Sequence, residues 1–132
     1  MKREAQKTVD TVNHYVSNRF LMSDIICPCC DNVRVVPGMY RHMRALENMI
    51  DELGVGIIIN SGYRCTRHNR QVGGAPRSWH LLFATDIAPE NGDPATLKLI
   101  ADRAEDFGFS GVGIYEKHIH LDMRPEKARW RG

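Results

Sequence analysis

"SWHLLFATDIAPE", residues 78–90, and "YEKHIHLDMR", residues 115–124, are the two stretches that decide the fold and the chemistry of this chain. In the second stretch His118, His120 and Asp122 alternate. Side chains repeat every two residues along a β-strand, so a strand here would present all three on one face. Three polar, ligand-type side chains on one face predict a strand that lines a cleft. An exposed strand face with ordinary histidines is the alternative.

The first stretch places His80 six residues before Asp86. Six residues of extended chain span about 20 Å, whereas two ligands of one zinc ion each lie about 2 Å from it. The two side chains can therefore share an ion only if the chain between them turns back, and no glycine stands there to ease such a bend. Their spacing alone is a weak indication of a metal site. We interpret the nearby His68 as a surface residue rather than a substrate contact.

Hydrophobic periodicity around these stretches predicts an α+β fold. An amphipathic helix is expected from residue 4 to about residue 20, where apolar residues recur at helical spacing. A second helix begins at Pro37 and ends at Gly54. A third has Asp93 as its N-cap. Strands are expected over residues 55–60, 83–88, 111–115 and 118–123, the last two as a hairpin. Residues 61–78 predict a long polar loop.

The 132 residues predict one domain. We divide it into an N-terminal helix over 1–22, a catalytic core over 23–124 and a basic surface tail over 125–132. A net charge of +2 is too small to indicate nucleic acid, and no apolar run is long enough for a membrane span. We expect a monomer. The first residues carry no apolar stretch of the signal-peptide type, so synthesis in the cytoplasm is expected.

From about residue 25 to about residue 124 the chain resembles the zinc D-alanyl-D-alanine peptidases, a family that shares its fold with the Hedgehog signalling domain and includes phage endolysin peptidases. The family pattern begins with S-G-Y-R, H-N and V-G-G, and this chain has "SGYRCTRHNRQVGGAPRS" at 61–78. The later elements, S-x-H-x-x-G-x-A-x-D and H-x-D, are represented by Ser78, His80, Asp86, His120 and Asp122. Here the first histidine and the aspartate are one position closer than in the family, and Phe83 stands near the expected glycine.

The resemblance implies a small, mainly antiparallel sheet with packed helices. It implies zinc held by His80, Asp86 and His120, with a fourth position open to water. The activity implied is hydrolysis of peptidoglycan stem peptides, as a D-Ala-D-Ala carboxypeptidase or an L-Ala-D-Glu-type endopeptidase. Cell-wall action without a signal peptide suits a phage-type lysin that another protein releases. A non-catalytic, zinc-containing cell-wall-binding or regulatory module of the same fold is the alternative.

The resemblance also suggests roles for the residues around the ion. Glu116 is the expected general base, with a solvated turn residue as the alternative. Asp122 is the second choice for that base, or else it orients the ring of His120. His118 resembles a residue that stabilises an oxyanion. Arg64 and Ser78 resemble substrate-holding residues, because an arginine fork matches a peptide carboxylate; a loop salt bridge and a turn cap are their alternatives.

The four cysteines are clustered in sequence, three of them in "CPCC". This is not the evenly spread pattern of a disulfide scaffold. Cys27, Cys29 and Cys30 could bind a structural zinc ion with Cys65 as the fourth ligand. We favour the other interpretation, a single contact between this loop and Cys65 as a disulfide or as packed thiols. A protein with such a cysteine-bound zinc and no open metal position is a further alternative to an enzyme.

Overall fold

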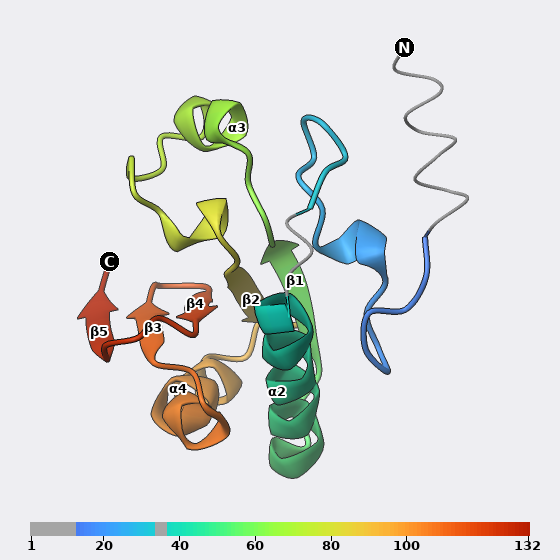
Figure 1. Ribbon diagram of the computed structural model, residues 1–132. Helices are drawn as coiled ribbons and strands as arrows, with labels where there is room; N and C mark the ends of the chain where they lie inside the picture. The colour runs from blue at the N-terminus through green and yellow to red at the C-terminus, as the bar shows by residue number, and fades with distance from the viewer. Residues whose placement is uncertain (1–12, 34–36) are drawn as a thin grey trace.

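A five-stranded sheet in the order β1-β2-β4-β3-β5 forms the centre of the molecule (Figure 1). The computed structural model describes residues 13–33 and 37–132. All neighbouring strands are antiparallel except β3 and β5, which are parallel. The predicted α+β fold with a mainly antiparallel sheet is therefore confirmed. The strands are β1 (Ile57–Ser61), β2 (Thr85–Pro89), β3 (Gly111–Ile114), β4 (Ile119–Asp122) and β5 (Ala128–Arg131).

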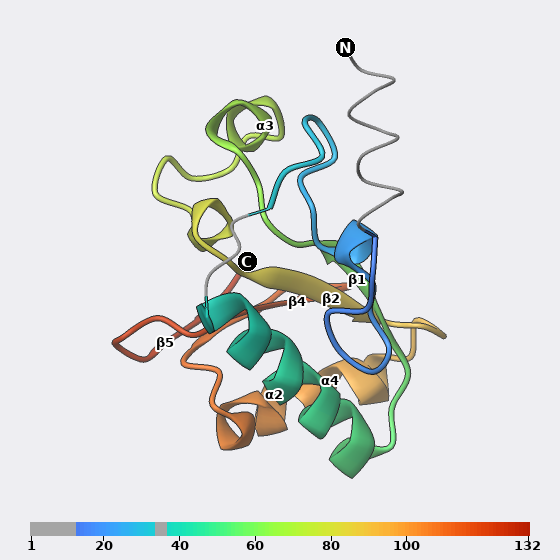
Figure 2. The ribbon, with the colours of Figure 1, turned by 45° about the vertical axis from the view of Figure 1, so that its right-hand side comes forward.

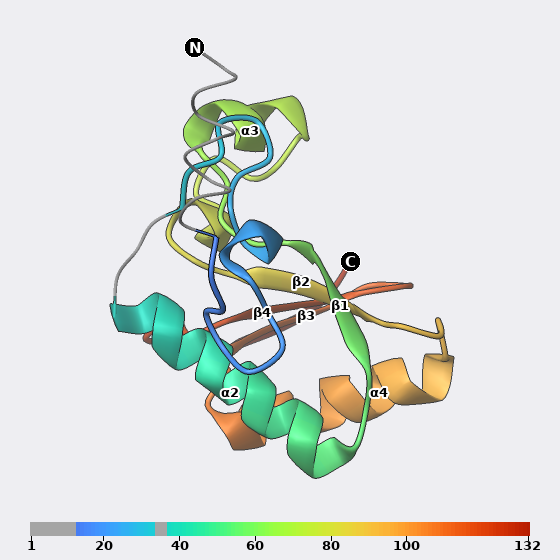
Figure 3. The same cartoon turned by 90° about the vertical axis from the view of Figure 1, so that its right-hand side faces the viewer.

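Two helices cover one face of this sheet, α2 (Pro37–Leu53) and α4 (Pro94–Arg103), the latter continued by the 3-10 helix η3 (Ala104–Phe107) (Figures 2 and 3). Asp93 caps α4 by accepting a hydrogen bond from the backbone N–H of Ala95. Both helices were predicted from their apolar spacing and are confirmed. No helix in the described residues has the length and apolar character needed to cross a membrane. The core includes Met39, Met43, Leu46, Met49, Ile50, Ile87, Ile100, Val112, Ile119 and Leu121.

Strands β2 and β4 have one face toward the hydrophobic core and the other face turned away from it. Ile87 and Leu121 are buried in the core on the helix side. Because side chains alternate along a strand, Asp86 and His120 project from the other face. The two are register partners across β2 and β4. The sheet therefore carries an apolar face against the helices and a ligand-type face opposite.

The predicted long loop over residues 61–78 is wrong in one respect, because it contains the short helix α3 (Thr66–Gln71). This helix lies on the side of the sheet opposite α2 and α4 (Figure 3). Its start is capped by the Cys65 sulfur, which accepts from the backbone N–H of His68. The sequence "TRHNRQ" contains no apolar stripe, so periodicity gave no sign of a helix.

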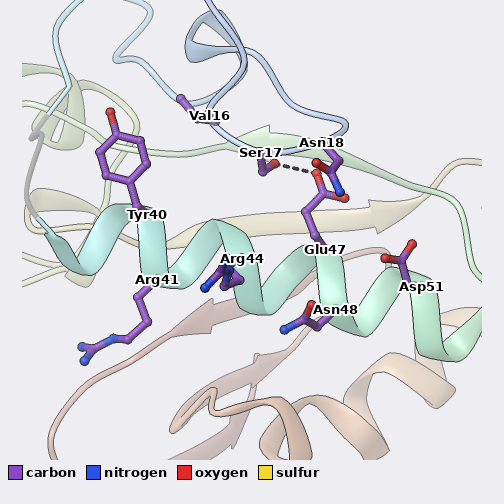
Figure 4. Close-up of a pocket in the computed structure, with 9 residues that line it drawn as sticks. All are labelled: Val16, Ser17, Asn18, Tyr40, Arg41, Arg44, Glu47, Asn48 and Asp51. Carbon is purple, nitrogen blue, oxygen red and sulfur yellow. Dashed lines mark hydrogen bonds between the residues drawn. The ribbon is translucent and has the colours of Figure 1, made fainter.

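The expected N-terminal helix is wrong for residues 13–20, while residues 1–12 of that prediction lie outside the described part of the chain. Tyr15 instead forms an isolated bridge with Leu21. Glu47 of α2 fixes the turn by accepting a hydrogen bond from Ser17 Oγ at 2.6 Å (Figure 4). It also accepts one from the Arg19 backbone N–H at 2.5 Å. A buried carboxylate thus satisfies donors that a helix would have bonded internally.

The basic tail over residues 125–132 lies largely at the surface as expected, but its residues 128–131 form the strand β5 and pair with β3, which was not predicted. Trp130 is partly buried there, and its indole N–H donates to the Tyr115 hydroxyl at 2.9 Å. The flanking Arg129 and Arg131 are exposed. A sequence with one large apolar residue among basic ones is typical of a surface tail. The parallel pairing with a distant strand leaves no local signal in the sequence.

His42 of α2 is a buried polar residue within the core. Its Nε2 lies 2.9 Å from Thr85 Oγ1, and its ring contacts Phe83 and Phe109 edge-on, each with a centroid distance of 4.9 Å. Burial lowers the pKa of His42 to about 3. An unfolded histidine has a pKa of about 6.5. Below that pH the unfolded chain binds a proton that the folded chain does not.

We therefore expect His42 to make the metal-free protein less stable as the pH falls from about 6.5 toward about 3, by up to about 1.4 kcal/mol per pH unit. Urea unfolding across this range should show that His42→Gln reduces the pH dependence of the unfolding free energy. Thr66→Ala, an exposed substitution on α3 of a residue that does not titrate, should leave it unchanged. An equal pH dependence in wild type and His42→Gln would contradict this account.

Candidate active site

Three side chains of the metal-ligating type converge on the ligand-type face of the sheet: His80, Asp86 and His120. Asp86 Oδ1 lies 3.1 Å from His80 Nε2 and 3.2 Å from His120 Nδ1. The two histidine nitrogens are 3.2 Å apart. All three ligand atoms lie within 4.8 Å of one another. Side chains from separate elements thus meet at one point.

A 3-10 turn between His80 and Asp86 keeps this segment from running extended, so that the two side chains can meet. His80 lies in the 3-10 helix η2 (Trp79–Leu81), and the next residue, Leu82, takes a right-handed helical conformation with φ −102° and ψ −79°. The chain is thereby turned back before β2 begins, without a glycine. Phe83, near the position where the family has glycine, is buried in the core beside His42.

The outer nitrogen of each histidine is hydrogen-bonded to a group that can only accept. His80 Nδ1 lies 2.7 Å from the carbonyl oxygen of Gly62 and therefore carries a proton. His120 Nε2 lies 2.7 Å from Asp122 Oδ2, where the same argument applies. The inner nitrogens, Nε2 of His80 and Nδ1 of His120, are then left with lone pairs that face each other.

Two lone pairs and a carboxylate oxygen within 3.2 Å of one another repel unless a cation lies between them. Histidine ligands of metals usually donate their other N–H to a carbonyl or a carboxylate, as both do here. The donor set therefore fits a metal ion. In the metal-free protein, burial raises the pKa of Asp86, but the adjacent imidazoles of His120 and His80 outweigh it and hold that pKa below the usual range. This carboxylate is the anionic ligand.

Asp122 is fully buried and supports His120 from behind. Its carboxylate accepts from Arg124 Nη2 at 2.6 Å and from Arg124 Nε at 2.8 Å. Burial raises the pKa of Asp122, but the hydrogen bonds from Arg124 and His120 outweigh it and lower that pKa. Gly111 of β3 makes room, because a Cβ there would overlap the Asp122 carboxylate. Asp122 thus stays ionised although it is buried.

An open cleft of about 790 Å³ lies over the three converging side chains. Arg124 is held in its wall between Trp79 and Trp130, 5.4 Å and 4.9 Å from the two ring centroids. Asp86 is the only acidic residue among those that line it, so the cleft is basic. Its polar and aromatic lining residues are Arg64, Arg77, Ser78, Trp79, His80, Asp86, Tyr115, His118, His120, Arg124 and Trp130.

A protein-family model described as Peptidase M15 matches residues 18–122 of the chain, which include all three converging side chains. The chain belongs to the peptidase M15 family. Members of this family are metallopeptidases, so the suspected relationship is confirmed at the family level. No curated protein sequence matches the chain.

Besides His118, the cleft of this M15 chain contains five predicted site residues, with Asp122 behind it: Arg64, Ser78, His80, Asp86 and His120. Arg64 is held by Asn69 Oδ1 at 2.9 Å and approaches Asp86 Oδ2 at 3.5 Å. Ser78 caps η2 by accepting from the His80 backbone N–H. The substrate-holding roles of Arg64 and Ser78 stay predictions.

The other two predicted residues of this M15 protein lie apart from each other. His118 lines the cleft, with its ring stacked on Tyr115 at a centroid distance of 4.4 Å. Glu116, the expected base, is exposed and lines a separate pocket of about 730 Å³ beside Asn60 and Leu97. Glu116 is therefore not among the residues that line the metal-ligand cleft. His68 also lies outside that lining.

Several residues of the M15 cleft were missed in the sequence. Gly62, Trp79, Tyr115 and Trp130 touch or line the site through contacts between distant segments. Gly62 stands in the S-G-Y-R segment of the family pattern and Arg77 directly precedes its Ser78, so these two carried a local signal. Aromatic residues at single positions have no spacing that indicates a cleft.

We expect Asp122→Asn to weaken metal binding by about 10- to 100-fold while the fold is kept, because an amide no longer fixes the proton on His120 Nε2. Chelator competition would measure the affinity, and circular dichroism the fold. The matched control is Asp102→Asn, which alters an exposed aspartate paired with Lys98 and should change neither. An unchanged affinity in Asp122→Asn would refute this role.

Proposed function

We propose that the protein is a zinc-dependent peptidase that hydrolyses the stem peptides of peptidoglycan and acts on the cell wall. The observation that carries this proposal is the convergence of two tautomer-fixed histidines and one aspartate at the base of an open, basic cleft. A phage-type lysin released by a separate protein is the setting in which we expect it to work. Membership of a metallopeptidase family supports the same conclusion.

Zinc is the metal that this donor set suits best. Two imidazoles and one carboxylate from the protein form the ligand set of catalytic zinc sites, in which a further position stays open to water or substrate. Bound there, zinc would lower the pKa of a water molecule and polarise a scissile carbonyl. His80, Asp86 and His120 would hold it, with the Gly62 carbonyl and Asp122 fixing the two rings.

The charge of the cleft favours a substrate with a free carboxylate. Three arginines line it, and two of them are already engaged: Arg64 with Asn69 and Asp86, and Arg124 with Asp122. Arg77 is exposed and has no ion-pair partner within the described residues. Its guanidinium can therefore accept a carboxylate in a bidentate manner. Stem peptides carry such carboxylates, which neutral peptides lack.

Proton transfer in the cleft is best assigned to His118. Its stacking on Tyr115, which in turn accepts from the Trp130 indole N–H, holds the imidazole at the cleft wall. An imidazole there can hold a proton or deliver one to a leaving amine. Asp122 is fully buried and bonded to His120 and Arg124, so it acts through His120 and does not contact substrate.

The direct test is to incubate the zinc-loaded protein with a defined muropeptide and to identify the products by mass spectrometry. We expect hydrolysis of a peptide bond, with the masses distinguishing loss of terminal D-alanine from cleavage within the stem. His120→Ala should lose both the metal of this site and the activity. Asp102→Asn is the folding-matched control and should retain both.

A zinc-loaded protein that binds cell-wall fragments without releasing any product would overturn the proposal. That outcome would favour the non-catalytic module of the same fold. The metal content of wild type and His120→Ala, measured in parallel, separates this outcome from a failure to load the site.

The two residues of the hairpin turn allow a matched comparison. We expect His118→Gln to reduce kcat by about 100-fold or more, as for loss of a general acid or base. Glu116→Gln should leave kcat within about twofold, because Glu116 lines a different pocket. Steady-state hydrolysis of the same muropeptide measures both. The reverse ranking would restore Glu116 as the base.

A further inference from the structure

A second group of potential metal ligands lies outside the cleft lining, where all four cysteines of the chain come together. Their sulfur atoms lie within 4.8 Å of one another. Cys29 Sγ is 3.2 Å from Cys65 Sγ and 3.6 Å from Cys27 Sγ. All four are free thiols. We call them the cysteine cluster, which consists of Cys27, Cys29, Cys30 and Cys65.

Two separate segments form the cysteine cluster. A tight turn presents three of the sulfurs, and it is closed by hydrogen bonds from the Cys27 N–H to the Asn32 carbonyl at 2.6 Å and from the Asp31 N–H to the Cys27 carbonyl at 2.8 Å. The fourth sulfur comes from Cys65, directly before α3. A hairpin-like turn with cysteines three residues apart, opposed by a cysteine from elsewhere, is a common arrangement for structural zinc.

The sulfur separations suit a tetrahedral ion. A zinc–sulfur bond of about 2.3 Å places tetrahedral sulfurs about 3.8 Å apart. The Cys27–Cys29 and Cys29–Cys65 sulfur distances of 3.6 Å and 3.2 Å lie somewhat below that value, and every sulfur pair falls within 4.8 Å. A disulfide joins only two sulfurs and would leave the remaining pair of thiols without a reason to converge. The geometry of all four thus favours a shared ion over a single bond.

Donors around the sulfurs provide the second observation. The Cys65 backbone N–H lies 3.4 Å from Cys27 Sγ, and the His68 N–H lies 3.3 Å from Cys65 Sγ. The Arg67 guanidinium approaches Cys29 Sγ at 3.9 Å. Four thiolates around one divalent ion carry a net charge of two negative units. Backbone N–H groups and a nearby arginine stabilise such a charge.

We propose that the cysteine cluster binds a structural zinc ion, distinct from the ion of the cleft. The four thiols lose their protons to solvent when the ion binds. Four protein ligands leave no position for water or substrate, so this site supports the fold and performs no chemistry. It ties the loop over residues 25–33 to the segment over residues 61–65. The proposed ion takes the place of the disulfide or packed thiols that the sequence favoured.

The segment that this ion holds also shapes the cleft. Gly62 supplies the carbonyl that fixes the His80 ring, and the Arg64 backbone N–H donates to the His80 carbonyl at 2.8 Å. The Tyr63 N–H donates to the Ile25 carbonyl at 2.9 Å, which joins the same segment to the cysteine loop. Loss of the structural ion should therefore loosen a contact of a catalytic metal ligand.

The test uses the full chain with His120→Ala, which removes the cleft ion and leaves the cysteine cluster intact. This variant, purified under reducing conditions, is expected to retain one zinc ion per chain by elemental analysis. Replacement with cobalt should give intense thiolate-to-cobalt charge-transfer absorption in the near ultraviolet, which a site of histidine and carboxylate ligands does not produce. Wild type should hold two ions.

Cys65→Ser in the same background is expected to lose this ion and its charge-transfer band, while Thr66→Ala, its exposed neighbour, keeps both. If Cys65→Ser fails to fold, titration of the thiols of His120→Ala with an organomercurial decides, because zinc must be released as the four thiols react. Absence of zinc from His120→Ala, a cobalt spectrum without the thiolate band, or a wild-type mass lower by two hydrogens before reduction, as for a disulfide, would each overturn the proposal.

Discussion

The pairing of β2 with β4 is the constraint on which the rest of the site depends. It places Asp86 directly opposite His120, on the face turned away from the core. A shift of β2 by one residue would turn Asp86 into the apolar layer and bring Ile87 to the cleft. Burial of Ile87 and Leu121 against the helices opposes such a shift, so the hydrophobic core fixes the position of the metal ligands.

Both histidine ligands are oriented by a hydrogen-bond acceptor, which positions their rings before any ion binds. The carbonyl of Gly62 fixes His80, and Asp122 fixes His120. Burying the Asp122 charge would be unfavourable on its own, and the bidentate pair with Arg124 offsets this cost. The aromatic rings on both sides of Arg124 hold it in place, so the cleft wall and the metal site form one connected unit.

The sequence predicted the elements that bury a continuous apolar stripe or strand, such as α2 and the hairpin of β3 and β4, because their periodicity reports burial directly. It also indicated His120 and Asp122 through alternation. The doubt about Asp86 came from treating residues 80–86 as extended, and it disappears because one 3-10 turn shortens the path. The turn over residues 13–20 and β5 could not be predicted, since tertiary hydrogen bonds and a distant pairing define them, and α3 carries no apolar stripe.

Gly62 links the loop of the cysteine cluster to the cleft. A Cβ on Gly62 would lie 2.6 Å from the carbonyl oxygen of Ile25, so the two backbones are in direct contact. The Gly62 carbonyl is at the same time the acceptor that fixes His80. A displacement of the loop at Ile25 would therefore move the Gly62 peptide group. The hydrogen bond that fixes the tautomer and orientation of the His80 ring would move with it. Burial of Ile25 in the core holds one end of this loop, and a tetrahedral ion bound to Cys27 and Cys65 would add a second attachment beside Gly62.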